Sequence, residues 1–96
     1  MYKIFLTKQV AKECKKRGVG FKKEVVKILQ TLQNDSSPTQ SEKLSGNLSS
    51  CRSYHFNFAG TAYRLAYQID EEAKIITAIM IGPRENFYKI LKQKFS

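Results

Sequence analysis

Arg64 is the residue whose place in the sequence points most directly to phosphate chemistry. It interrupts a segment in which Tyr63, Leu65 and Tyr67 occupy every second position, the pattern of a β-strand with one buried face. The guanidinium of Arg64 should therefore lie on the other face, where its planar donors could bind a phosphate. The ordinary alternative is an exposed strand residue without a chemical role.

Arg84 and Tyr88 form a second candidate pair near the end of the chain. Arg84 follows Gly82 and Pro83 at the expected entrance of a helix, where backbone N–H groups and a guanidinium could together hold a phosphate. Tyr88 comes one helical turn later, so the two side chains could share a helix face. The alternatives are a surface arginine near a turn and a tyrosine packed in the core.

His55 is the only histidine, and it shares the polar positions of an alternating strand with Asn57. An unperturbed histidine titrates near neutral pH, which suits a general base. The same polar positions could place His55 on the side of the sheet that carries Arg64. A hydrogen-bonded or solvated bystander is the alternative for His55, and plain polar surface is the alternative for Asn57.

Signatures of several enzyme classes are absent from the sequence. It has no Gly-x-Ser-x-Gly elbow, no Gly-x-x-x-x-Gly-Lys phosphate loop, and no Gly-x-Gly-x-x-Gly after a strand. Cys14, Cys51 and His55 are too few for a four-ligand zinc site, and acidic residues are sparse. We therefore expect no metal and no cofactor, so that any phosphoryl chemistry would be metal-free.

Length and charge indicate a small protein that binds a polyanion. The 96 residues fit one domain, 1–96, and seventeen Lys and Arg against eight Asp and Glu give a net charge of +9. Residues 1–33 alone contribute +7. A solvated lysine-rich helix face is the alternative to a nucleic-acid surface. Two distant cysteines and the lack of an apolar signal or membrane-spanning run predict a soluble, cytoplasmic protein with no membrane partner.

The N-terminal third should contain a strand and two helices. Residues 2–6 have the composition of a strand, and Thr7 can cap the helix that follows. Gly18 and Gly20 should interrupt that helix, and a second one, with apolar residues every three or four positions, should then run to about Gln33. The two helices would form a hairpin.

The remaining two thirds predict a sheet and a final helix. A loop at 34–41 is followed by alternating strands at 52–58 and 63–69, and by a strand buried on both faces at 74–81, which the next Gly-Pro pair should end. A last helix from about Glu85 should dock on the sheet. The order βααβββα predicts an α+β fold with a mainly antiparallel sheet of about four strands. The hairpin would cover one face, and the other face would present the site.

Three short segments resemble the RelE-type toxins of bacterial toxin-antitoxin modules. They are 43–46 (KLSG), 63–70 (YRLAYQID) and 81–88 (IGPRENFY), and they contain Leu-x-Gly, Tyr-Arg-Leu-x-Tyr and Gly-x-Arg-x-x-x-Tyr in that order. Together with the N-terminal helical hairpin, the resemblance covers essentially the whole chain. It implies a ribosome-dependent mRNA endonuclease that a cognate antitoxin neutralises. The expected partners are thus the antitoxin, the ribosome and mRNA.

The resemblance also implies roles for single residues. RNA carries its own nucleophile, because a 2′-hydroxyl in line with the adjacent phosphorus can displace the 5′-oxygen and leave a 2′,3′-cyclic phosphate. Arg64 and Arg84 would stabilise transition-state charge, and Tyr88 would orient the reacting oxygens or exchange a proton with them. His55 and Asn57 stand where well-studied members carry two lysines, so the general base is either His55 or Tyr88.

The expected activity is cleavage of mRNA in the ribosomal decoding site, with the lysine-rich helices bound to ribosomal RNA by charge and shape. The alternatives are a non-catalytic ParE-type toxin that inhibits DNA gyrase, and an RNA-binding module without toxicity. The combination of Arg64, Arg84 and Tyr88 argues against both. The candidate RNA-binding residues are Lys12, Lys15, Lys16, Arg17, Lys22, Lys23, Arg52 and Asn57.

Overall fold

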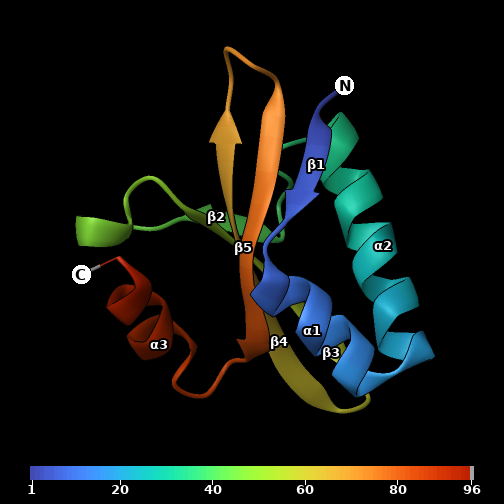
Figure 1. Ribbon diagram of the computed structural model, residues 1–96. Coiled ribbons are helices and arrows are strands. Elements are labelled where there is room, and N and C mark those ends of the chain that lie inside the picture. Colours follow the sequence, from blue (N-terminus) through green and yellow to red (C-terminus); the bar gives the residue numbers. More distant parts are fainter. Residues whose placement is uncertain (96) are drawn as a thin grey trace.

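A single twisted sheet organises the protein, and a computed structural model describes residues 1–95 of it (Figure 1). Within those residues the sheet has five strands, in the order β1-β5-β4-β3-β2. Their bounds are β1 Lys3–Leu6, β2 Ser41–Lys43, β3 Arg52–Phe58, β4 Thr61–Asp70 and β5 Ile75–Pro83. β1 runs parallel to β5 and the other neighbouring pairs are antiparallel. The α+β class and the mainly antiparallel sheet are confirmed.

Two helices form the predicted hairpin on one face of the sheet. They are α1 (Lys8–Arg17), whose first turn is capped by the Thr7 hydroxyl, and α2 (Val19–Asn34). The break between them is Gly18 alone, with φ +98°, a backbone conformation that favours glycine. The prediction that Gly20 also interrupts the helices was wrong, because α2 already begins at Val19. Among residues 1–95 no helix has the length and apolar character to cross a membrane.

The sequence predicted about four strands, and the described chain contains one more. The loop expected at 34–41 ends in β2, which pairs with β3 at the edge of the sheet. Three residues are too few to show a two-residue period, so the sequence pattern did not reveal this strand. β2 matters for the site because it places Glu42 beside β3.

The passage from β5 to the last helix also differs from expectation. The strand does not stop before Gly82 but continues through Pro83, which lies past the end of the β1 pairing and so has an open side where its missing N–H is tolerated. A turn follows, and Asn86 has φ +62°. Helix α3 therefore starts at Phe87 (Phe87–Lys94), two residues later than the predicted Glu85.

Two cores lie on the two faces of the sheet. On the hairpin face, Tyr63, Leu65 and Tyr67 are buried against α1 and α2, as their alternation predicted. The core of the opposite face is formed beneath α3 and the 3₁₀ turn Gly46–Leu48. Its buried members are Leu48, Ala66, Met80, Phe87 and Leu91. Helix α3 thus docks on the sheet as expected, and it covers part of the face that carries the candidate site.

The docking of α3 can be tested with two adjacent residues. Leu91 is fully buried, whereas Ile90 is 48% exposed. We expect Leu91→Ala to lower the free energy of unfolding by about 2–4 kcal/mol, because it removes buried methyl groups and leaves a cavity. Ile90→Ala should cost less than about 1 kcal/mol. Urea unfolding followed by circular dichroism measures both, and equal losses would show that α3 does not pack on the sheet as described.

Candidate active site

The cross-strand pair of His55 on β3 and Arg64 on β4 forms the centre of the candidate site. Directly paired residues point to the same face of a sheet, and here that face is the one opposite the helical hairpin. The predicted common side of His55 and Arg64 therefore agrees with the register. On β5, the residue paired with Arg64 is Gly82, so the directly paired position has no side chain.

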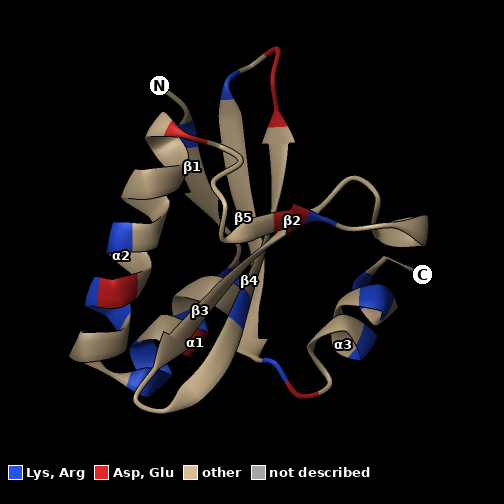
Figure 2. Ribbon diagram, turned by 180° about the vertical axis from the view of Figure 1, so that it is seen from behind, with Lys and Arg blue, Asp and Glu red and all other residues tan. Residues whose placement is uncertain are grey.

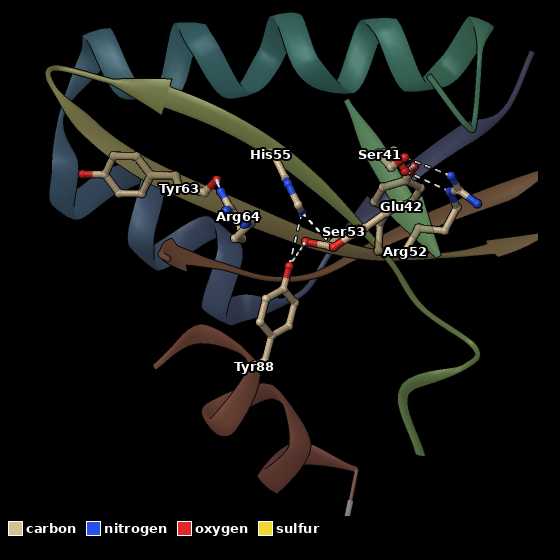
Figure 3. Close-up of polar contacts among 9 residues, drawn as sticks. Ser41, Glu42, Arg52, Ser53, His55, Tyr63, Arg64 and Tyr88 are labelled. Carbon is tan, nitrogen blue, oxygen red and sulfur yellow. Dashed lines mark hydrogen bonds and ion pairs between the residues drawn. The ribbon is translucent and has the colours of Figure 1, made fainter. Parts of the chain in front are cut away.

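Tyr88 reaches this pair from α3 (Figure 3). Its hydroxyl oxygen lies 3.2 Å from His55 Nε2 and 3.2 Å from the hydroxyl oxygen of the buried Ser53. Glu42 Oε1 lies 3.3 Å from the same His55 nitrogen. The tyrosine has one proton and two neighbouring acceptors, so donation to His55 and donation to Ser53 are alternatives.

This contact set is suited to a change in the protonation of His55. When Nε2 is unprotonated, it can accept the hydrogen bond of Tyr88. When Nε2 gains a proton, it can donate to the Glu42 carboxylate, and the Tyr88 hydroxyl can then donate to Ser53 instead. The neighbourhood can thus satisfy both states without moving the backbone.

Burial is the main cause of a lowered pKa at His55, and the positive charge of Arg64 lowers it further. Glu42 opposes both effects through its negative charge and its hydrogen bond. The result is a pKa below the ordinary value of 6.5, so that the neutral imidazole is favoured at neutral pH. A neutral imidazole is the form that a general base requires.

Arg64 retains donors for a ligand. Its Nη1 donates to the Tyr63 carbonyl oxygen at 3.1 Å, whereas its buried Nε has no hydrogen-bond partner within the described part of the chain. A buried N–H without a partner costs free energy, and a change in side-chain conformation that brings Nε to an acceptor, such as a phosphate oxygen, would remove that cost. Arg64 therefore differs from an ordinary exposed strand residue.

Arg84 lies two residues beyond Gly82 and flanks the site with an exposed side chain. Its backbone N–H is not free for a phosphate, because it donates to the Ala62 carbonyl oxygen at 2.8 Å. Arg84 also precedes α3, so the helical spacing expected to align it with Tyr88 does not apply. Ala62 pairs with Asn57, whose exposed side chain lies two positions along β3 from His55.

The other predicted RNA-binding residues lie away from the site. Arg52 has the opposite strand parity from His55, and its guanidinium is held by Ser41, at 2.8 Å from the hydroxyl oxygen and 3.2 Å from the carbonyl oxygen. Arg17 is bound to Glu13 at 2.9 Å and to the Tyr63 hydroxyl at 3.1 Å. The remaining residues are exposed on the hairpin, where Figure 2 shows several of the basic residues. They are Lys12, Lys15, Lys16, Lys22 and Lys23.

Sequence reasoning missed Glu42 and Ser53. Ser53 has the same strand parity as His55, so the alternating pattern could have identified it. Glu42 had no such signal, because it belongs to the edge strand that the pattern did not reveal.

No group of three or more His, Cys, Asp or Glu side chains that could hold a metal ion occurs in residues 1–95. Burial raises the pKa of the Cys14 and Cys51 thiols, so both should stay protonated at neutral pH. The site thus offers one group that can take a proton near neutral pH, one phenolic hydroxyl beside it, and guanidinium donors for an anion. That combination fits proton transfer next to a phosphate.

Comparisons with known proteins identify the family. Residues 4–92 match the model of the ParE-like toxins of type II bacterial toxin-antitoxin systems, and the chain belongs to that family. Its recognition as a toxin of the wider RelE and ParE group is confirmed. No curated protein matches the chain.

Solved structures of the E. coli toxin RelE, alone and in complex, have the same fold as this chain. The isolated E. coli RelE toxin is 23% identical with a TM-score of 0.67, over 98% of this chain and 99% of that chain. The toxin-antitoxin complex RelBE from E. coli gives 21% identity and a TM-score of 0.66, over 85% of this chain and 95% of that chain. At these identities the likeness establishes the fold.

The only histidine gives a direct test of the site's electrostatics. We expect the imidazole signals of His55 in NMR spectra to titrate below pH 6.5, because burial and Arg64 disfavour the charged form. Arg64→Ala should raise the midpoint, and Glu42→Gln should lower it. Lys27→Ala, an exposed substitution on α2, serves as the control.

The same lowered pKa has a consequence for stability. The unfolded chain binds a proton at the ordinary value of 6.5 and the folded chain only at lower pH. The free energy of unfolding should therefore fall as the pH drops below 6.5, and this part of the loss should be absent in His55→Gln. In the NMR titration, a His55 midpoint at or above pH 6.5 that Arg64→Ala leaves unchanged would contradict the described site.

Proposed function

We propose that this protein is the toxin of a type II module and that it cleaves mRNA on the ribosome, with the RNA 2′-hydroxyl as the nucleophile. The observation that carries the proposal is the meeting of His55 and Tyr88 at 3.2 Å beside Arg64, whose buried Nε has no partner within residues 1–95. A pure binding surface has no need of a proton acceptor next to a guanidinium with an unpaired N–H. Translation is cytoplasmic in bacteria, so a cytoplasmic location belongs to the same proposal.

The proposed roles follow from the contacts. When the Tyr88 hydroxyl donates to Ser53, His55 Nε2 is free to take the proton of the 2′-hydroxyl as that oxygen attacks phosphorus. The bond from phosphorus to the 5′-oxygen then breaks to leave a 2′,3′-cyclic phosphate, and the 5′-oxygen takes up a proton. Tyr88 lies beside His55, and its hydroxyl is proposed to supply the proton that the leaving oxygen takes up. Arg64 stabilises the charge that grows on the phosphate, and exposed Arg84 adds a second guanidinium from the rim.

Partners follow from charge. The exposed lysines of the hairpin and the net charge of +9 suit ribosomal RNA, to which binding should weaken steeply with salt. The same charge suits an antitoxin with acidic side chains and an apolar segment. E. coli RelE, which has this fold, is known in complex with its antitoxin RelB. We extend that kind of partner to this chain as part of the proposal.

A second candidate is a ParE-type toxin that inhibits DNA gyrase without catalysis. The description of the matched family favours it, because it refers to ParE-like toxins. The two candidates predict different damage in cells.

Induction in a bacterium should distinguish them. We expect translation to stop and new mRNA ends to appear within translated regions, because the proposed site acts on RNA held by the ribosome. The ends should vanish when initiation is blocked, and they can be mapped by sequencing 5′ ends. Double-strand DNA breaks with intact mRNA would support the gyrase inhibitor instead.

Arg64 provides the test of the chemistry. We expect Arg64→Ala to lower the single-turnover cleavage rate at saturating ribosome by about a hundredfold or more, because it removes donors that meet charge developing in the transition state. Ribosome affinity should change little. Arg52→Ala is the matched control, since Arg52 lies on the adjacent strand and its side chain is directed to the other face.

The two arginine variants must also be compared for folding. If Arg64→Ala is folded, binds ribosomes and cleaves at the parental rate, the proposed role of Arg64 is wrong. If Arg52→Ala loses as much cleavage at saturation as Arg64→Ala, the loss does not report on the site.

A further inference from the structure

A cavity of about 330 Å³ opens next to the contact between Tyr88 and His55. It lies between the turn that follows β2 and helix α3. Its lining includes Glu42, Leu44, Ser45, Asn47, Tyr88 and Lys92. Two of these residues, Glu42 and Tyr88, also contact His55, so the cavity is continuous with the site where the phosphate is proposed to react.

The wall of the cavity is fixed by its own contacts. Leu48 is buried in the core beneath α3 and anchors the turn. Backbone hydrogen bonds join Leu44 N–H to the Cys51 carbonyl at 3.0 Å, and Cys51 N–H to the Leu48 carbonyl at 2.9 Å. The cavity is therefore a preformed feature and does not depend on a loop closing over a ligand.

The lining carries one negative charge, on Glu42, and one positive charge, on Lys92, so it is better suited to an uncharged group than to a phosphate. Glu42 brings a negative charge into the cavity, and only Oε1 of its carboxylate is used by His55. The Leu44 side chain and the Tyr88 ring supply apolar and aromatic surface, while Ser45 and Asn47 supply hydroxyl and amide groups. An uncharged, flat ring with hydrogen-bond donors on its edge matches this surface.

We propose that this cavity receives the base of one of the two nucleotides that flank the cleaved phosphate, and that it makes cleavage depend on the identity of that base. This inference rests on the proposed cleavage of RNA. Lys92, an exposed lining residue on α3, would hold a backbone phosphate of the same nucleotide by its charge.

The carboxylate of Glu42 predicts which bases are favoured. An ionised carboxylate only accepts hydrogen bonds, and it pairs well with the exocyclic amino groups of cytosine, adenine and guanine. Uracil has no amino group, and its one donor on the Watson–Crick edge, N3–H, lies between two carbonyl oxygens that would repel the carboxylate. Asn47 carries both a donor and an acceptor and can read a further position on the base edge.

The test uses full-length protein on ribosomes programmed with mRNAs that differ only in the base on either side of the cut. We expect the parental protein to cleave the mRNA with uracil at one of these two positions about tenfold more slowly than the mRNA with the best base there. Glu42→Gln should bring that ratio close to one, because a glutamine amide can donate to uracil. Asn47→Ala should also lower it, and Asn34→Ala, an exposed substitution at the end of α2, should not.

The ratio compares substrates within one variant, so any effect of Glu42→Gln on His55 cancels. Equal rates for all four bases at both positions would overturn the inference and leave the proposed function standing. An unchanged ratio in Glu42→Gln would also overturn the inference. If Glu42→Gln does not cleave at all, an unchanged ratio in Asn47→Ala would overturn it instead. A parental protein that cuts none of the mRNAs would overturn the proposed function, and this inference with it.

Discussion

The pairing of His55 with Arg64 across β3 and β4 is the constraint on which the rest of the site depends. The hairpin turn sets that register, with Ala59 and Gly60 both at positive φ, as tight turns between antiparallel strands require. A slip of one residue in β4 would turn Arg64 toward the helical hairpin and Tyr63 toward the opposite face. The buried aromatic residues of the hairpin face therefore fix the chemistry of the opposite face.

Helix α3 couples the second core to the site. Phe87 and Leu91 are buried beneath it, while Tyr88, between them in sequence, reaches His55. The edge strand β2 makes the corresponding contribution from the other side by presenting Glu42. His55, the general base that we propose, is thus held between α3 and β2 at the margins of the fold. Its polar contacts depend on both elements.

The strongest periodic patterns predicted most of the fold. The alternation around Tyr63 and the three- and four-residue spacing in α2 gave the right elements and the right buried faces. The pattern could not reveal β2, because three residues contain no period, nor the delayed start of α3, because the Asn86 turn replaces the expected first helical turn. Among the site residues, the common face of His55 and Arg64 followed from parity, whereas the contacts of Tyr88 required the docking of α3.

If His55 takes the proton from the RNA, the pH dependence of single-turnover cleavage on saturated ribosomes reports its protonation. We expect the rate to fall on the acid side with a midpoint below 6.5, equal to the midpoint of the His55 imidazole, because a protonated imidazole cannot accept a proton. We also expect His55→Gln to be slower and to lack this acid limb. An acid limb that is the same in the parental protein and in His55→Gln would contradict this role of His55.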